Sequence, residues 1–558
     1  MRRCSRPKHA SLALFAVALA TAIVLGHALA IGVVAQETAT AEKTTATTEP
    51  LHERIDRLIE ARHQGPASEL TTDAEFLRRV SLDLIGRIPR ADEVRAFLAD
   101  ASADKRGQAI DRLLASPEHP ARMADFLHVM LMERQGDAPE WRKYLADSVA
   151  ANKPWDKMVR DMIHADAADE SLRGAAFFFT KRLENYGQNP VDVPGMVRDV
   201  GRLFLGVDVQ CAQCHDHLFV KDYTQDYYQG LFAFVGQAQI RRDVKFPALA
   251  ETPLKKKVEF TSVFVKEPRV IGPKLPGGKE FEVPEMKPDE QFEVPPDRKT
   301  NFPGVPRFST LKLLAEQLPT AENRAFARNM ANRLWWLAMG RGLVHPLDLH
   351  HSDNPASHPE VLELLAAEFT ARQFDIRWLL GELTRTRAYQ RSSRIPADVA
   401  PDSVPEDSYR TALEKPLSSE QWAASVAEAA GVAARERQSA EAWEKLRERF
   451  AKAFANPPKE PETEFAPSVK AALFLMNDPV VLGWFQPANG NLSERLAGIA
   501  ESDRAVDELY VAVLSRTPDA EERAEAVEML AKHADKRSAA LGRLAWALLT
   551  STEFGVNH

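Results

Sequence analysis

The sequence lacks the short motifs that mark several large enzyme classes. It contains no P-loop, no G-x-G-x-x-G at a strand-to-helix turn, no G-x-S-x-G and no H-E-x-x-H. Nucleotide hydrolysis, dinucleotide binding, serine-hydrolase action and standard zinc proteolysis are therefore unsupported.

The chain also lacks an excess of positive charge. Lysine and arginine number 72 against 80 acidic residues, which gives a net charge of -8 and a pI of about 6.1. No basic stripe with interleaved aromatic residues occurs, and the two signs of charge are intermixed, as on solvated helix faces. We expect no nucleic-acid partner.

Cysteine is scarce, with three residues in a chain of 558. Cys4 lies in the charged N-terminal segment without the upstream apolar residues of a lipidation site, so we assign it no function. Cys211 and Cys214 are therefore the two cysteines that can carry chemistry.

The N-terminus has the outline of a secretory signal. Basic residues precede an apolar run from Leu12 to Leu25, and small residues follow at Ala28 and Ala30. Residues 1–35 are therefore predicted to be a signal peptide, with an uncleaved membrane anchor as the alternative. The protein is expected to be exported to the periplasm or cell envelope, with possible attachment to the membrane.

The rest of the chain is predicted to be mainly α-helical, with two helical domains separated by a small β-rich or extended insert. With 44% hydrophobic residues, it is long enough to bury a sizeable core. A Thr- and Ala-rich flexible linker is expected first, and the expected segments are 36–50 (linker), 51–240 (helical), 241–305 (insert) and 306–558 (helical).

Local patterns support this division. Phe76, Val80 and Leu84 recur at helical spacing, and Gly86 ends that helix. The insert is rich in proline and contains two alternating runs that predict short strands, 258–260 and 263–265. It is interpreted as a spacer or partner surface. Helices are expected again at 322–339, 358–373 and 418–455.

One internal similarity joins the two helical domains. In each, an R-x-P turn opens a helix, and a later helix ends in L-L-x-S-x-E; the turns begin at Arg87 and Arg516. Shared turn chemistry and a true duplication both explain this similarity.

The segment from Cys211 to His217 carries the clearest chemical motif, C-x-x-C-H. Two thiols at this spacing can form thioethers with the vinyl groups of a haem, and the following imidazole can bind the iron. Cys211 and Cys214 are therefore candidate attachment points for haem c, with His215 as the proximal ligand.

Other interpretations of this segment remain open. Cys211, Cys214 and His217 have the spacing of a zinc knuckle, and a site for zinc or iron using His215 or His217 is the main alternative. The two cysteines could instead form a disulfide or be buried free thiols. Export favours the interpretation as a haem site, because a zinc knuckle is expected in a cytosolic protein.

Several runs resemble one known family. They are 76–84, 211–219, Arg333-Leu334-Trp335, 340–344 and 357–360. These runs are similar to the planctomycete cytochrome-like proteins, in which a domain of unknown function 1549 precedes a domain of unknown function 1553. The resemblance implies the first domain at about 51–240 and the second at about 306–555.

What this resemblance implies is an exported, cytochrome-like protein, without a known activity or substrate. Many relatives carry an additional cytochrome domain with its own C-x-x-C-H, which this sequence lacks, so electron transfer would depend on the motif at Cys211. Relatives have proline before the phenylalanine that follows the motif, whereas this chain has Leu218 before Phe219.

No methionine follows the motif at the distance usual for a sixth iron ligand, since the next one is Met286 in the insert. The remaining candidates are Met196, His164, His350, His351 and His358. The alternative is an open position, which would permit ligand or peroxide chemistry.

A second polar cluster contains His345, Asp348, His350, His351, Asp353 and His358. It could bind a divalent metal or support acid-base catalysis in a hydrolase, although such turns are more often solvated loops.

The leading hypothesis is a haem-binding redox protein with an unknown redox or protein partner. The alternative is a non-redox scaffold whose C-x-x-C-H-x-H loop is held by a metal or disulfide. Whether the protein is an enzyme stays open.

Overall fold

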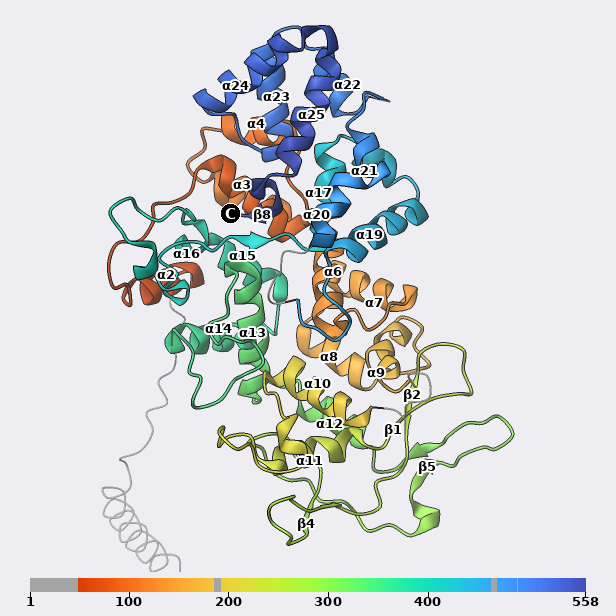
Figure 1. The fold of residues 1–558 in the computed structure, drawn as a ribbon. Coiled ribbons are helices and arrows are strands. Elements are labelled where there is room, and N and C mark those ends of the chain that lie inside the picture. The colour runs from red at the N-terminus through yellow and green to blue at the C-terminus, as the bar shows by residue number, and fades with distance from the viewer. Residues whose placement is uncertain (1–48, 185–191, 463–468, 489) are drawn as a thin grey trace, which may run out of the picture. The chain divides into compact units, whose positions relative to one another are not determined.

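Helices dominate the computed structural model, which describes residues 49–184, 192–462, 469–488 and 490–558. Helix accounts for 55% of the chain, and the strands form short antiparallel pairs only. The prediction of a mainly α-helical protein with a small strand-containing segment between helical regions is confirmed (Figure 1).

The first helical region runs from Leu51 to Val235. Its helices are α2 (Leu51–Glu60), α3 (Asp73–Ile85), α4 (Ala91–Ala99), α5 (Lys105–Leu114), α6 (His119–Met132), α7 (Pro139–Ala150), α8 (Trp155–Ile163), α9 (Phe177–Arg182), α10 (Val193–Leu205) and α11 (Gln225–Val235). Two 3-10 turns accompany them, η1 (Arg173–Ala176) and η2 (Cys211–Gln213).

Helix α3 shows how local sequence sets these boundaries. The side chain of Thr72 accepts a hydrogen bond from the main-chain nitrogen of Glu75, and the Glu75 carboxylate accepts one from the main-chain nitrogen of Thr72. Gly86 ends the helix in the left-handed conformation, with φ of 77°. Phe76 and Val80 are buried as their spacing predicts, so capping and core packing agree.

The insert contains three two-stranded sheets. Its strands are β1 (Ala238–Ile240), β2 (Leu249–Glu251), β3 (Val258–Phe260), β4 (Arg269–Ile271), β5 (Phe292–Val294) and β6 (Val305–Pro306), with η3 at Pro288–Glu290. They pair antiparallel as β1 with β2, β3 with β4 and β5 with β6. The predicted strand at 258–260 is present, but the one at 263–265 is absent, because those residues form a bend against the cysteine motif.

The second helical region begins after β6. It contains α12 (Thr310–Gln317), α13 (Arg324–Met339), α14 (Pro359–Ala371), α15 (Ile376–Arg385), α16 (Arg387–Gln390), α17 (Ser419–Ala429), α18 (Ala433–Glu436), α19 (Ala440–Phe454), α20 (Val469–Asn477), α21 (Pro479–Trp484), α22 (Leu492–Ala497), α23 (Ser502–Leu514), α24 (Ala520–Lys532), α25 (Arg537–Leu549) and α26 (Thr552–Gly555). The short elements are η4 (Pro401–Ser403), η5 (Glu406–Ser408), β7 (Lys415–Pro416), η6 (Ala534–Lys536) and β8 (Val556–Asn557).

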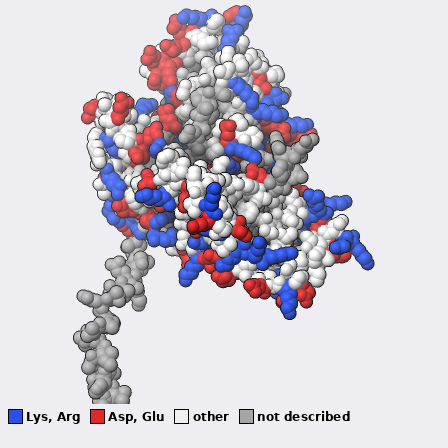
Figure 2. All heavy atoms as spheres, turned by 60° about the horizontal axis from the view of Figure 1, so that its bottom comes forward, with Lys and Arg blue, Asp and Glu red and all other residues white. Residues whose placement is uncertain are grey.

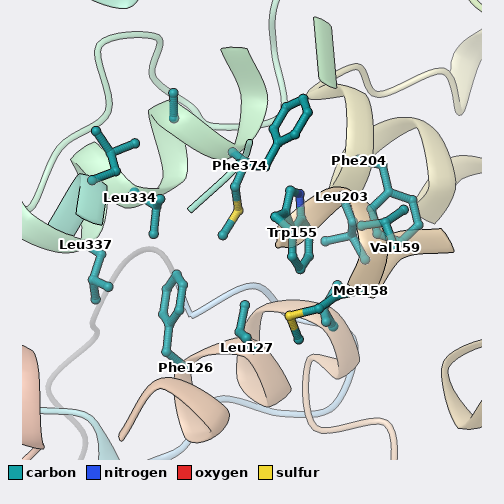
Figure 3. Packing of buried hydrophobic residues seen from close by; sticks show 14 of the residues in the cluster. Phe126, Leu127, Trp155, Met158, Val159, Leu203, Phe204, Leu334, Leu337 and Phe374 are labelled. Atoms are coloured by element: carbon teal, nitrogen blue, oxygen red, sulfur yellow. The ribbon is translucent and has the colours of Figure 1, made fainter. Parts of the chain in front are cut away.

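Two hydrophobic core clusters organise the unit from Leu51 to His558, and they do not divide at the predicted boundary of 306. The first cluster extends mainly from Leu51 to Tyr409, so helices α12 to α16 share a core with the first helical region. Figure 3 shows part of this cluster, with Phe126 of α6 directed toward α13. The second cluster consists mainly of residues from Leu417 to Phe554.

The predicted signal or anchor, residues 1–35, and nearly all of the predicted linker, residues 36–50, lie outside the described residues. Among the helices that are described, none is both long and apolar enough to cross a membrane.

Candidate functional site

The cysteine motif lies at the end of α10, on a turn that the sequence specifies locally. Gly206 ends α10 in the left-handed conformation, with φ of 73°, and its main-chain nitrogen donates to the carbonyl oxygen of Arg202. The carboxylate of Asp208 then accepts a hydrogen bond from the main-chain nitrogen of Gln210 (2.9 Å). The chain next enters the 3-10 turn η2, which begins at Cys211.

The second helical region holds this turn through hydrogen bonds. The main-chain nitrogen of Asp208 donates to the carbonyl oxygen of Asp348 (3.0 Å), and that of His350 donates to the carbonyl oxygen of Gly206 (3.0 Å). The hydroxyl of Tyr223 donates to the carbonyl oxygen of His350 (3.2 Å). The cysteine motif and part of the 345–358 segment are therefore neighbours, which their distance in the sequence did not indicate.

Buried ion pairs support the same end of α10. Arg202 binds Glu133 (2.7 Å) and Asp348 (2.8 Å), and Asp199 binds Arg182 (2.8 Å). Burial alone would raise the pKa of Asp199, but the guanidinium groups of Arg182 and Arg202 outweigh it and lower the pKa to about 2. These charges fix the backbone from which the motif projects, and sequence reasoning missed them because their partners come from distant helices.

Both cysteines of the motif are free thiols and are exposed. The interpretation as buried thiols is wrong, because Ala212 between them is the residue that packs into the core. The carbonyl oxygen of Gln213 accepts hydrogen bonds from the side-chain amides of Gln225 (3.3 Å) and Gln229 (3.2 Å) in α11. Helix α11 therefore fixes the turn while both sulfur atoms remain accessible.

The imidazole of His215 is oriented by the backbone. Its Nδ1 lies 2.6 Å from the carbonyl oxygen of Asp216, and this acceptor requires a proton on Nδ1. The lone pair is then on Nε2, which is the arrangement of a metal-ligating histidine whose other nitrogen donates to a carbonyl group.

The imidazole of His217 has the opposite arrangement. Its Nδ1 accepts hydrogen bonds from the main-chain nitrogens of Phe219 (3.2 Å) and Val220 (2.9 Å). The proton of the neutral ring is therefore on Nε2, and neither nitrogen has a free lone pair. His217 closes its own loop in this geometry, whereas His215 presents a nitrogen that can bind a metal.

Exposed apolar side chains lie next to the motif. They are Leu218 (65% exposed), Phe219 (83%), Val263 (64%), Phe264 (66%) and Val265 (56%), and we call them the apolar rim. The main-chain nitrogen of Val263 donates to the carbonyl oxygen of Cys214 (3.1 Å), and the ring of Phe264 lies 4.9 Å from that of His215. Part of the insert therefore belongs to the site.

The candidates for a distal iron ligand are dispersed. Met196 is buried in the first core cluster, and His358 is buried against Tyr409. His164 is exposed at the end of α8. His351 packs its ring on Tyr223, at 5.5 Å between centroids. Within the described chain, none of them shares a hydrogen bond or ring contact with His215.

The polar cluster at 345–358 does not converge on one centre. Asp348 is held by arginines, and His350 lies against Asn332, with its Nε2 3.4 Å from the amide nitrogen. Shielding from water lowers the pKa values of His350 and His358 to about 4. No group of three or more His, Cys, Asp or Glu side chains is placed to hold a metal ion in the part of the chain that the structure describes.

These features define a mainly helical protein with an exposed C-x-x-C-H turn. Residues 54–239 match the family described as a protein of unknown function (DUF1549), and residues 312–452 match the one described as a protein of unknown function (DUF1553). The two matches cover more than half of the chain, which therefore belongs to the family with a DUF1549 domain followed by a DUF1553 domain. The comparisons with curated proteins and with solved structures found no match.

Proposed function

We propose that the protein is an exported, cytochrome-like protein that binds one c-type haem at Cys211 and Cys214, with His215 as the proximal ligand. The observation that carries this proposal is the orientation of the His215 ring, whose Nδ1 bonds to the Asp216 carbonyl oxygen and leaves Nε2 for iron. When bound, the haem would supply one-electron redox chemistry.

The state of the two cysteines fits covalent attachment. Thioether formation needs both sulfur atoms reduced and accessible, and Cys211 and Cys214 are free and exposed. Because Ala212 and the amides of α11 fix the turn, both sulfur atoms are presented without unfolding the segment.

The apolar rim gives a second line of support. A porphyrin has two large apolar faces, and burying them against apolar side chains is favourable at roughly 25 cal/mol per Å². Leu218 and Phe219 follow the motif directly, and Phe264 lies against His215, so both segments can cover a haem held at the two thiols. Exposed apolar side chains grouped in this way commonly mark a binding site.

The main alternative is a non-redox scaffold with a structural metal or disulfide at the same loop. The two cysteines favour neither zinc nor haem, since they can bind zinc as thiolates or join haem vinyl groups as thioethers. His217 weighs against the C-x-x-C-x-x-H zinc knuckle, because its Nδ1 already accepts two main-chain hydrogen bonds. A metal site that uses His215 in its place stays compatible with the geometry.

Surface charge is consistent with a partner other than nucleic acid. Figure 2 shows acidic and basic side chains interspersed over the face drawn, without a broad basic area. The redox or protein partner is therefore proposed to recognise the site at the apolar rim through apolar contacts, with a mixed-charge periphery.

An absorption spectrum tests the proposal. The full chain is produced in a host with haem-attachment machinery, with Cys211→Ala/Cys214→Ala as the matched control. We expect a Soret band that persists after denaturation and acid extraction in the wild type and is absent from the double variant. A colourless wild type would refute haem binding if it holds one equivalent of zinc, or if thiol titration finds a disulfide between Cys211 and Cys214. Either result would favour the non-redox scaffold.

Export is tested separately. The full chain is expected in the periplasmic or membrane fraction, and N-terminal sequencing of that material distinguishes a cleaved signal from a retained anchor. Recovery of the unprocessed chain in the cytoplasm alone would contradict export, and it would also remove the argument that favours haem over a cytosolic metal site.

A further inference from the structure

A cavity of about 170 Å³ lies away from the cysteine motif, between α6, the end of α13, β7, the start of α17 and the end of α19. Its lining includes Arg122, Phe126, Trp336 and Phe454, and no residue of the motif contributes to it. An apolar cavity of about 150 Å³ is large enough to hold benzene. The space therefore suits a ring with a small substituent.

Arg122 supplies an unusual charge to this cavity. The residue is 8% exposed, and within the described residues its guanidinium makes one hydrogen bond, from Nε to the carbonyl oxygen of Asp83 (3.3 Å), and no ion pair. Burial lowers the pKa of Arg122, and the carboxylates of Asp83, Asp125 and Glu420 offset this effect only in part. Arg122 lines the cavity, and in the described structure no carboxylate lies within ion-pair distance of its guanidinium.

The local backbone is built to admit this side chain. Gly86 ends α3 with φ of 77°, and a Cβ atom there would lie 2.9 Å from Cδ of Arg122. Any residue with a side chain would therefore displace the stem of Arg122 or strain the turn. A glycine at the end of α3 therefore leaves the space that the side chain of Arg122 occupies.

Five acidic side chains line the cavity, and all of them except Glu414 have other cations as partners. Asp83 binds Lys415 (2.7 Å), Asp125 binds Arg142 (3.0 Å) and Arg447, and Glu420 (2.6 Å) and Glu462 (2.7 Å) both bind Arg134. Because these four carboxylates are paired with other cations, Arg122 is the cation in the described lining that has no contact ion pair.

Two further polar atoms in the lining are buried and have no partner. They are Nε1 of Trp336, a donor, and Oδ1 of Asn557, an acceptor. The ring of Trp336 lies 6.5 Å from that of Phe126 in a stacked arrangement, so one side of the cavity is aromatic. Figure 3 shows Phe126 among the residues of the first core cluster. Buried polar atoms of this kind require a ligand or water to satisfy them.

We propose that this cavity binds a small aromatic carboxylate, with the carboxylate on Arg122 and the ring between Phe126, Trp336 and Phe454. A guanidinium binds a carboxylate through two parallel hydrogen bonds, which supplies the missing counter-ion. The site does not involve haem, so the test of this proposal is independent of the function proposed for the cysteine motif.

Benzoate is the probe, and benzyl alcohol is its neutral match, because both carry the same ring. Isothermal titration calorimetry on the full chain is expected to show benzoate binding about tenfold more tightly than benzyl alcohol, since a charge-assisted pair is lost with the alcohol. Acetate, which lacks the ring, is expected to bind more weakly than benzoate. Equal affinities for benzoate and benzyl alcohol, or no binding of benzoate, would overturn the proposal.

Two variants locate the site. Arg122→Met is expected to abolish the preference for benzoate, and Arg112→Met, which removes an exposed arginine on α5, is the control and should leave it unchanged. If Arg122→Met does not fold, Val129→Phe, which fills the cavity from α6, is expected to block benzoate. Unchanged binding in the folded cavity variant would place benzoate elsewhere and refute the assignment.

Discussion

Arg87 and Arg516 lie at equivalent positions in two separate helical units and make matching interactions. Each guanidinium binds two glutamates and the carbonyl oxygen of the next residue: Glu93, Glu118 and Ile88 for Arg87, and Glu522, Glu553 and Thr517 for Arg516. Both arginines follow a helix of 13 residues that ends in the left-handed conformation. The sequence similarity of the two segments is therefore matched by equivalent structure.

The two arginines differ in burial, and this predicts different stability effects. The side chain of Arg87 is 2% exposed, whereas that of Arg516 is 24% exposed. We expect Arg87→Met to lower the free energy of unfolding by about 3 kcal/mol, because it leaves partly buried carboxylates unpaired. Arg516→Met should cost about 1 kcal/mol, since water screens that site more strongly.

Urea unfolding checks this prediction, with Arg504→Met as the control. Arg504 is 76% exposed and forms a single surface pair with Glu501, so its loss should change stability by less than about 0.5 kcal/mol. Equal losses for the Arg87 and Arg516 variants would show that burial does not set the strength of these networks.

Gly206 permits the close approach of His350, and this can be separated from backbone strain. A Cβ atom on Gly206 would lie 2.7 Å from Cδ2 of His350, whereas Gly277 has nearly the same φ, 70° against 73°, with nothing within 4 Å. Gly277→Ala should therefore cost about 1 kcal/mol from backbone strain alone. Gly206→Ala should cost about 3 kcal/mol, because the contact adds to that strain.

Thermal and urea unfolding of the two glycine variants provide the comparison. A similar loss in both would mean that the His350 ring moves aside without cost. The carbonyl oxygen of Gly206 accepts a hydrogen bond from His350, which holds the turn that carries Cys211. Gly206→Ala should weaken this hydrogen bond, and the Cys211 thiol is then expected to react faster with maleimide.

His350 predicts a loss of stability in acid. Shielding from water lowers its pKa from an ordinary value near 6.5 to about 4, and Arg333 acts in the same direction. The unfolded chain therefore binds a proton between pH 6.5 and 4 that the folded chain does not. This contribution to stability is complete above pH 6.5 and is lost as the pH falls toward 4, by up to about 3 kcal/mol.

The measurement is urea unfolding from pH 7.5 to 4.5 in the wild type and in His350→Gln. His119 and His358 have pKa values lowered to the same figure of about 4, so the wild type is expected to lose stability steeply. The variant should show a shallower slope, with one protonation removed. An unchanged slope would mean that His350 titrates alike in both states.

Much of the fold follows from local sequence. Helix α3 could be predicted from the sequence, because its signals are local. They are the apolar spacing of Phe76 and Val80 and the helix end at Gly86. The run at 263–265 has strand-like alternation, yet its Val263 bonds to Cys214 and forms no strand. A tertiary contact of this kind overrides the local pattern, and no periodicity could have indicated it.

The candidate site was predictable in its residue types and not in its geometry. Spacing alone identifies Cys211, Cys214 and His215, but the difference between His215 and His217 depends on which main-chain group each Nδ1 meets. The sequence has the apolar residues Leu218 and Phe219 directly after the motif, but only the fold shows that they are exposed and that Phe264 lies against His215.

The two histidines of the motif should separate ligand binding from loop stability. In the haem-free protein, His217→Ala removes the acceptor of two main-chain hydrogen bonds and should lower the free energy of unfolding by about 1–2 kcal/mol. His215→Ala should change it by less than about 0.5 kcal/mol, since in the described structure its ring has one hydrogen bond, to the adjacent carbonyl oxygen, and a contact with the exposed ring of Phe264.

In protein carrying haem, the order of effects should reverse. His215→Ala is expected to shift and weaken the Soret band, and millimolar imidazole should restore it, because the free base can occupy the vacated position on the iron. His217→Ala should keep the wild-type spectrum whenever it is folded. A spectral change in His217→Ala without one in His215→Ala would show that His217, and not His215, is the iron ligand, and would contradict our assignment.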